Sequence, residues 1–361
     1  MRRAFLFLLL IPLGAPAAEK PAVAELLEDD AETLLPLLTN DGEDLTDDNA
    51  AVEKTDVFTG KTALRVGSVQ RFNANLKGWE FTIAEKPGPG EYRYVRFAWK
   101  KSANTALMLQ LASRETGWDH HRYTAGPEAQ PWEAKTLTAE APREWVVVTR
   151  DVFKDFGAMT VTGIAFSPMG YGGDGLFDHV VLGRTVEDLD THTLAALKKT
   201  APATKLTPAR LDGYWKALGQ ADDTNALWQL VAHREQAAAF LKERLAALTP
   251  AAAAPVPAAT AAPLIAAAAH HRFVVREPAG LELKKLGAGV LPHVREAIAA
   301  ADGEAKDRLL AVLRTWDGDI SDDRLRLERC RVVLDAVGTA EAKGLSARVA
   351  AHLKTPAEVK R

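Results

Sequence analysis

The stretch GWDHHRYTAG, from Gly117 to Gly126, gathers two histidines, an aspartate, an arginine, a tryptophan and a tyrosine. Imidazole and carboxylate groups bind metals or transfer protons, whereas indole and phenol rings stack on flat ligands. If the stretch is a strand, His120 and His121 point to opposite faces and cannot share one metal. A zinc site also needs three or four protein ligands, and His179 is the only other histidine before residue 190. We therefore expect a ligand-binding face here, not a metal or catalytic centre.

Five residues form the predicted ligand-binding set. They are Trp118, His121, Arg122, Tyr123 and, from a later segment, Trp132. Indole rings stack on the apolar faces of sugar rings, and polar side chains beside them bond the hydroxyls. Glycine and proline punctuate the segments around Trp118 and Trp132, which favours their exposure. Ordinary strand and loop packing is the alternative for the whole set.

Sequence motifs for nucleophilic, metal-dependent or phosphate chemistry are absent: the chain has no G-x-S-x-G, no H-E-x-x-H and no P-loop. Paired acids such as Asp222 and Asp223 lie in polar segments typical of a solvated surface. A glycan-active enzyme can take its two carboxylates from distant segments, so that class stays as an alternative. The motifs favour a non-enzymatic binding protein.

The elements that position these residues fall into two parts. From Val52 to Gly183, short alternating runs separated by turn residues predict an all-β sandwich. In YRYVRFAWK, Val95, Phe97 and Trp99 share the face predicted to be core. The expected β domain covers residues 45–190. It follows an acidic entry segment, 19–44, that either wraps the sandwich or is solvated, and it precedes a linker at 191–206.

The second part, residues 207–355, is rich in alanine and leucine, with apolar residues at helical spacing. Short helices that cannot bury their apolar stripes alone predict antiparallel pairs stacked into an α-solenoid. An Ala/Pro-rich insert at 249–263 interrupts them. The predicted fold class is therefore multidomain β plus α, with an N-terminal β-sandwich and a C-terminal α-solenoid.

The first 18 residues have the order of a secretory signal peptide: Arg2 and Arg3, an apolar run from Ala4 to Leu13, then small residues. The run is too short to span a bilayer comfortably. We expect cleavage, a secreted or periplasmic location by the general secretory or the twin-arginine route, and no membrane insertion. The formal net charge of −3 without a basic block predicts no nucleic-acid partner, and the single Cys330 excludes an intramolecular disulfide.

Two family resemblances rest on specific stretches. VFTGKTALRVGS and GLFDHVVLG resemble the entry and closing strands of the galactose-binding-like jelly rolls of carbohydrate-binding modules. The stretch RFNANLKGWEFTIAEKPGPGEYRYVRFAWKK resembles an uncharacterised domain of large secreted bacterial proteins still more closely. FVVREPAGLELKKLGAGVLPHVREAI resembles a HEAT-like repeat of the phycobilisome-lyase type, with Arg276, Leu283 and Pro292 in matching positions. The resemblances imply a jelly roll that recognises a glycan or envelope component, and HEAT-like helix pairs that dock a protein.

The jelly-roll resemblance also implies a structural Ca²⁺ bound by Asp178 of the closing strand, with Asp48 or Glu53 as co-ligands. Leu176, Asp178 and Val180 alternate onto one face, so this carboxylate lies in line with apolar side chains. A buried carboxylate must be neutralised by a cation or by hydrogen-bond donors. Two interpretations stay open: calcium, or a hydrogen bond to backbone amides or to a nearby Arg or Lys.

Three hypotheses about function follow. The first is an exported, non-enzymatic binding or scaffold protein, whose jelly roll recognises a glycan or envelope component and whose repeats dock a protein partner. The second is a structural subunit whose two domains both serve protein assembly. The third is a cryptic glycan-active enzyme.

Overall fold

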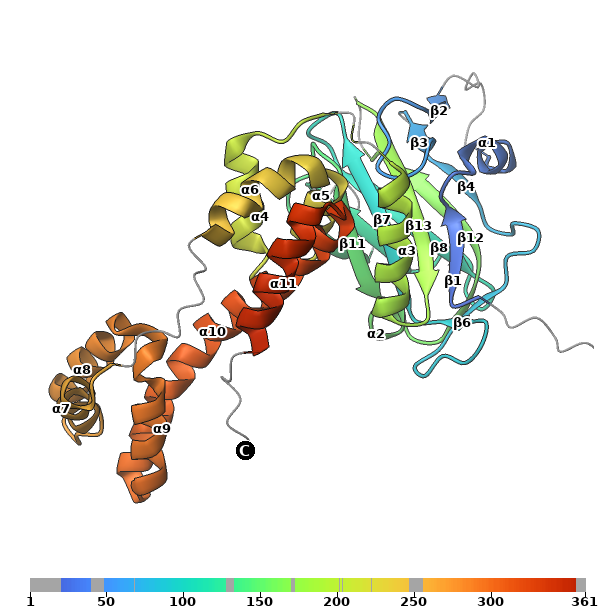
Figure 1. Cartoon of the computed structure of the whole chain (residues 1–361). Helices are drawn as coiled ribbons and strands as arrows, with labels where there is room; N and C mark the ends of the chain where they lie inside the picture. The colour runs from blue at the N-terminus through green and yellow to red at the C-terminus, as the bar shows by residue number, and fades with distance from the viewer. Residues whose placement is uncertain are drawn as a thin grey trace, which may run out of the picture.

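The computed structural model describes residues 21–39, 49–67, 69–127, 133–169, 173–200, 202, 204–221, 223–246 and 256–354. Two facing sheets come first, and helices follow them in the chain (Figure 1). The expected signal peptide, Asp48, Trp132 and most of the insert at 249–263 lie outside the described residues. Within those residues, no helix combines the length and the apolar character that crossing a bilayer requires.

The β part consists of a six-stranded and a seven-stranded sheet within the described residues. The six-stranded sheet runs β11 (Val146–Asp151), β7 (Tyr94–Lys101), β13 (Gly175–Gly183), β3 (Ala63–Val66) and β2 (Ala50–Glu53), with β1 (Val23–Leu27) paired to β13. The seven-stranded sheet runs β10 (Lys135–Thr138), β9 (Arg122–Ala125), β8 (Leu107–Ser113), β12 (Met159–Ser167), β5 (Phe81–Ile83) and β6 (Glu91–Tyr92), with β4 (Arg71–Asn73) paired to β12. Most pairs are antiparallel, as the alternating sequence predicts for a sandwich.

The core between the sheets confirms the predicted phase of β7. Val95, Phe97 and Trp99 are each at most 1% exposed and pack against residues of the seven-stranded sheet. Arg96 and Ala98, on the opposite face of the same strand, are also fully buried. That opposite face is therefore covered as well, and the covering elements are helices.

The acidic entry segment wraps the sandwich. Strand β1 pairs antiparallel with β13, and α1 (Ala31–Leu34) and a 3₁₀ turn (Leu35–Leu37) follow it. Beyond β13 the chain enters α3 (Val186–Lys199), which lies along β13 on the outer face of the six-stranded sheet (Figure 1). The segment expected to be a linker thus contributes most of a helix, which a capping box between Thr185 and Asp188 starts.

A first group of helices packs against the same outer face. The group comprises α4 (Pro208–Ala217), α5 (Asn225–Ala232), α6 (Arg234–Ala246), the C-terminal part of α10 (Gly303–Val337) and α11 (Ala340–Lys354). Its apolar cluster also contains Phe58, Ala98 and Val147 of the β part. The Val147 N–H donates to Asn225 Oδ1 at 2.9 Å, so a backbone group left open by the edge strand β11 is paired with a helix.

A second group lies at the other end of α10 (Figure 1). It comprises α7 (Ala258–Ala268), α8 (Phe273–Lys285), a 3₁₀ turn (Gly287–Val290) and α9 (Leu291–Ala300). The sequence analysis predicts short helices, whereas the structure has the single 35-residue α10, which ends at the left-handed Gly338 (φ 71°). The helices are present as expected, and one long helix of about 50 Å connects the two groups.

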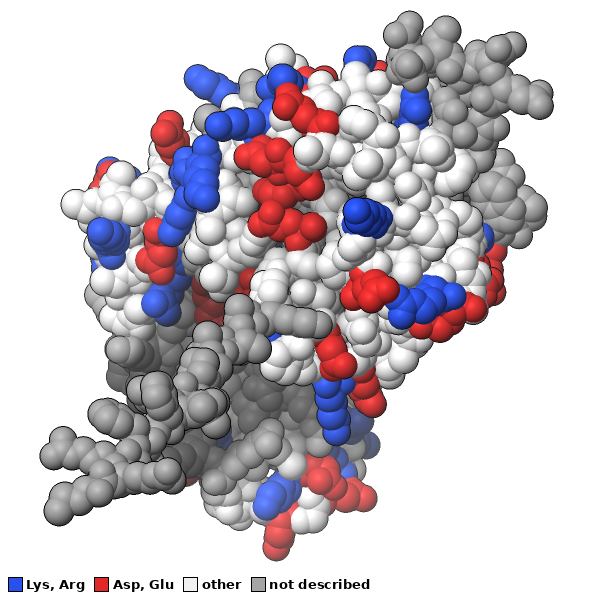
Figure 2. Space-filling view, turned by 90° about the vertical axis from the view of Figure 1, so that its right-hand side faces the viewer, with Lys and Arg blue, Asp and Glu red and all other residues white. Residues whose placement is uncertain are grey.

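Surface charge on one side of the β part is mixed. Figure 2 shows acidic and basic side chains interspersed among uncharged ones, and a compact group of acidic side chains lies near the middle of that face. Among its coloured residues no extended basic patch is visible.

Candidate ligand-binding site

The outward face of the seven-stranded sheet carries the candidate site. On β8, Leu107, Leu109 and Leu111 point into the core, so Met108 and Gln110 point to the other face. This face holds a recess of about 200 Å³, here called the Trp118 recess. It is lined by Gln70, Phe72, Met108, Gln110, Trp118, Arg122 and Ala165.

Hydrogen bonds from two side chains to its backbone hold the loop that carries Trp118. Gln110 Nε2 donates to the carbonyl oxygens of Trp118 (2.7 Å) and Asp119 (3.0 Å). Arg122 Nη2 donates to the same Trp118 oxygen at 2.9 Å, and Gly117 makes the turn with φ 65°. Side chains of β8 and β9 therefore both anchor the backbone of the loop that carries Trp118.

Two aromatic rings form the walls of the recess. Trp118 and Phe72 meet edge to face, with ring centroids 5.9 Å apart, and both are half-buried. Met108 and Ala165, each 2% exposed, form an apolar floor between them. Burial lowers the pKa of Arg122, whose guanidinium stays the charged group of this face. The recess thus combines apolar rings with amide and guanidinium groups.

Trp118 and Arg122, from the predicted binding set, meet in this recess, but His121 and Tyr123 do not. Tyr123 is completely buried between the sheets, and its hydroxyl donates to Asp155 Oδ2 at 3.1 Å. Burial and then Asp155 raise the pKa of this phenol well above its usual range. The expectation that Tyr123 contacts ligand is wrong, because β9 turns Arg122 outward and its neighbour inward.

His121 is also a packing residue. Its side chain is buried, with 4% exposed, and its ring contacts Phe156 edge to face at 5.5 Å. Burial and the neighbouring His120 lower the pKa of His121, so the ring is neutral at pH 7. The prediction that it belongs to a ligand face is wrong, because His121, like Tyr123, is buried. Sequence reasoning missed Phe72, Gln70 and Gln110, which the short strand β4 and the outward phase of β8 bring to the recess.

A larger recess of about 540 Å³ is lined in part by the same loop. Its lining includes Trp79, Glu80, Arg114 and Gly117. Arg114 and Glu80 form an exposed ion pair across it, and Trp79 packs edge to face on Phe81 with centroids 5.5 Å apart. Since Gly117 lines this recess and Trp118 the other, one loop borders both.

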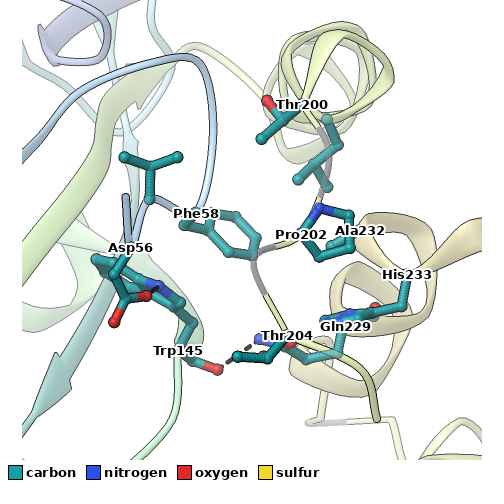
Figure 3. A pocket seen from close by; sticks show the side chains of 11 residues that line it. Asp56, Phe58, Trp145, Thr200, Pro202, Thr204, Gln229, Ala232 and His233 are labelled. Atoms are coloured by element: carbon teal, nitrogen blue, oxygen red, sulfur yellow. Dashed lines mark hydrogen bonds between the residues drawn. The ribbon is translucent and has the colours of Figure 1, made fainter. Parts of the chain in front are cut away.

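A small third recess, of about 30 Å³, lies where the sandwich meets the helices (Figure 3). Phe58 and Trp145 line it from the β part, and Thr200, Gln229 and His233 from the helices. Trp145 Nε1 donates to Asp56 Oδ1 at 2.9 Å, and Gln229 donates to the Trp145 carbonyl oxygen. The bond from Gln229 joins the two parts of the chain, so we assign this recess to the junction.

The acids expected to hold calcium have other partners. Asp178 is fully buried, and its carboxylate accepts the N–H groups of Phe58 (2.7 Å), Thr59 (3.0 Å) and His179 (2.7 Å). Burial raises the pKa of Asp178 well above its usual range. Among the described contacts, Glu53 Oε1 accepts hydrogen bonds only from residues 54–56, within its own turn. This arrangement matches the second interpretation, in which backbone amides satisfy Asp178, and calcium there stays a prediction.

No protein-family model and no curated protein matches this sequence. Solved structures with some likeness include a mutant of a family 29 carbohydrate-binding module, at 12% identity over 45% of this chain and 93% of that one, with a TM-score of 0.27. The glycoside hydrolase domain of Endo-D from Streptococcus pneumoniae R6 has 15% identity over 41% and 21%, with a TM-score of 0.27. An exo-beta-agarase has 12% identity over 66% and 32%, with a TM-score of 0.26. At such low values the likeness carries no argument about function.

Taken on its own geometry, the chain is a β-sandwich protein with a helical C-terminal part. Its recessed, aromatic-walled face belongs to the β part.

Proposed function

We propose that this chain is an exported, non-enzymatic binding protein whose sandwich holds a carbohydrate in the Trp118 recess. The observation that carries the proposal is the edge-to-face pair of Trp118 and Phe72 over an apolar floor, with Arg122 beside them. An indole face covers the C–H face of a pyranose ring, while amide and guanidinium groups bond its hydroxyls. The resemblance of the entry and closing strands to jelly-roll carbohydrate-binding modules supports the same ligand class.

The absence of acids in the described lining favours binding over hydrolysis. Glycoside hydrolysis uses two carboxyl groups flanking the scissile bond, about 5–10 Å apart. Neither Asp nor Glu is among the described residues that line the Trp118 recess. Bound glycan should therefore leave the protein unchanged.

Affinity electrophoresis against a panel of polysaccharides tests this proposal. We expect one or more soluble polysaccharides to retard the full protein, with no reducing sugar released on long incubation. Release of reducing ends would move the assignment to the glycan-active enzyme. Retardation by none of the panel, which should include bacterial envelope glycans, would favour the structural assembly subunit.

Protein docking by the helical part is a second candidate function, and exposed apolar side chains on α8 favour it. Phe273, Val274 and Leu281 are 57%, 75% and 58% exposed, which is unusual for neighbouring large apolar residues on one helix. HEAT-like pairs stacked as a solenoid would present such faces to a partner. A photo-crosslinking side chain at Val274 should yield one discrete crosslinked product in cells, whereas the same side chain at the exposed Glu243 should not. Identical products from both positions would contradict docking at α8.

A further inference from the structure

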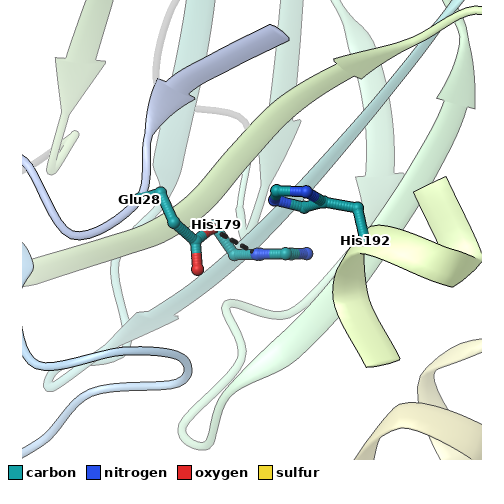
Figure 4. Close-up of side chains that lie close together, drawn as sticks. All are labelled: Glu28, His179 and His192. Atoms are coloured by element: carbon teal, nitrogen blue, oxygen red, sulfur yellow. Dashed lines mark hydrogen bonds and ion pairs between the residues drawn. The ribbon is translucent and has the colours of Figure 1, made fainter. Parts of the chain in front are cut away.

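Three potential metal ligands from separate elements meet beneath α3, on the outer face of the six-stranded sheet. Glu28 follows β1, His179 lies on β13 and His192 lies on α3 (Figure 4). One ligand atom from each lies within 4.8 Å of the other two. This group, here called the Glu28 cluster, is on the opposite sheet from the Trp118 recess.

The backbone aims His179 at the cluster. The pairing of β13 shifts register after Asp178, and His179 adopts φ 52°, the left-handed region that non-glycine residues rarely occupy. Such a bulge redirects a side chain, and its strain persists only where surrounding contacts fix it. Here Asp178 fixes it by accepting the His179 N–H at 2.7 Å.

Hydrogen bonds orient the imidazole of His179 as they do in known metal sites. Nδ1 lies 2.6 Å from Glu28 Oε2, and Nε2 lies 2.7 Å from Thr193 Oγ1. With Nε2–H donating to the Thr193 hydroxyl, Nδ1 is the nitrogen that can bind a metal once the proton it shares with Glu28 has left. A histidine whose second nitrogen donates to a fixed oxygen acceptor is the usual arrangement around a bound metal.

His192 completes the donor set. Its Nε2 is buried and has no hydrogen-bond partner among the described residues; the nearest acid, Glu25, lies at 3.6 Å, beyond hydrogen-bond length. Burial and then His179 lower the pKa of His192, which keeps this imidazole neutral. Burial alone would raise the pKa of Glu28, but the charge and hydrogen bond of His179 outweigh it and keep the carboxylate ionised. Once the proton shared by Glu28 and His179 leaves, a carboxylate and two neutral imidazoles remain, and these are ligands that zinc prefers.

We propose that Glu28, His179 and His192 bind one divalent ion of the zinc class. The ion takes the place of the proton between Glu28 and His179 Nδ1, so binding releases that proton. With ligand bonds of about 2.0–2.2 Å, the donors of a tetrahedral ion lie about 3.3–3.6 Å apart. Glu28 Oε2 and His179 Nδ1, now 2.6 Å apart, must therefore separate slightly, and donor atoms now up to 4.8 Å apart must approach by about 1 Å. Glu25 or a water fills the fourth position. The ion then ties the entry segment, the sheet and α3 together.

Metal content and thermal melting of the full protein test the site. After EDTA treatment, zinc should bind at one equivalent per chain and raise the melting temperature, whereas Ca²⁺ and Mg²⁺ should not. His192→Gln should remain folded but lose both the bound zinc and the rise. His120→Gln, which changes a half-exposed histidine outside the cluster, should keep both.

A second variant separates a metal site from a merely structural pair. Thr193→Val removes the hydroxyl that orients His179 and should weaken zinc binding about 10- to 100-fold. The proposal is overturned if zinc does not bind, or if His192→Gln binds it as the unchanged protein does. It is also overturned if Thr193→Val leaves the zinc affinity unchanged.

Discussion

The guanidinium of Arg96, on β7, lies 4.6 Å from the ring centroid of Trp228, on α5. Arg96 is completely buried. Its Nη2 forms an ion pair with Asp190 at 2.6 Å, and its Nη1 donates to Thr193 Oγ1 at 2.9 Å. The stacked pair joins the outer face of the six-stranded sheet to α5, and the bonds to Asp190 and Thr193 join it to α3. The β part and the first helix group therefore form one packed unit.

Replacing Arg96 should uncouple that unit. Arg96→Ala removes a desolvated cation–π contact and should lower the free energy of unfolding by about 2 kcal/mol or more. Arg65→Ala, which removes an exposed ion pair with Asp174 at 3.4 Å, should cost about 0–1 kcal/mol. Urea denaturation of both variants measures the difference. Equal losses would show that Arg96 does not join the two parts.

Asp178 should act as a structural acceptor. Asp178→Ala leaves the buried N–H groups of Phe58 and Thr59 without their acceptor, so unfolding should become easier by about 1–3 kcal/mol. EGTA should not change the melting temperature of the unsubstituted protein. A clear fall in melting temperature with EGTA, abolished in the variant, would instead place calcium at this carboxylate.

Glu53 should contribute to stability only above acidic pH. Hydrogen bonds from Thr55 outweigh burial and lower the pKa of Glu53 from 4.5 to about 2. Because the folded-state pKa is depressed, the stabilisation is complete above pH 4.5 and is lost as pH falls towards 2. Glu53→Gln should flatten the stability profile in that window, whereas the exposed Glu80→Gln should not. Parallel profiles for all three proteins would contradict this role.

On α8, two neighbouring leucines should differ sharply. Leu283 is fully buried in the second helix group, so Leu283→Ala should cost about 2–5 kcal/mol through lost transfer energy and a cavity. Leu281 is 58% exposed, and Leu281→Ala should leave the melting temperature nearly unchanged. Thermal melts followed by circular dichroism at 222 nm would check both. A larger loss of stability in Leu281→Ala than in Leu283→Ala would show that Leu281 lies on the buried face of α8.

The sequence predicted those features that depend on local alternation. Val95, Phe97 and Trp99 were placed on the core face of β7 because apolar residues recur there at period two. The burial of Arg96 and Ala98 could not be predicted, since it depends on helices far along the chain. The continuity of α10 was also missed, because a break between two apolar stripes does not require a break in the helix.

The candidate sites were predicted less completely. Trp118 and Arg122 were found because both lie within one short stretch, but the phase of Tyr123 was misjudged since an aromatic residue suits either face. Phe72 comes from a three-residue strand too short to show a period. The Glu28 cluster draws on three elements, and only the fold brings Glu28 to His179.

The affinity of the Trp118→Ala variant for the best polysaccharide from the panel tests the central claim most directly. Isothermal titration should give a dissociation constant at least tenfold higher than that of the unchanged protein, a loss of about 1.4 kcal/mol. Trp215→Ala, a change on α4 far along the chain from the recess, should bind as tightly as the unchanged protein once both variants are shown to be folded. An unchanged dissociation constant for Trp118→Ala would show that the carbohydrate does not bind in this recess.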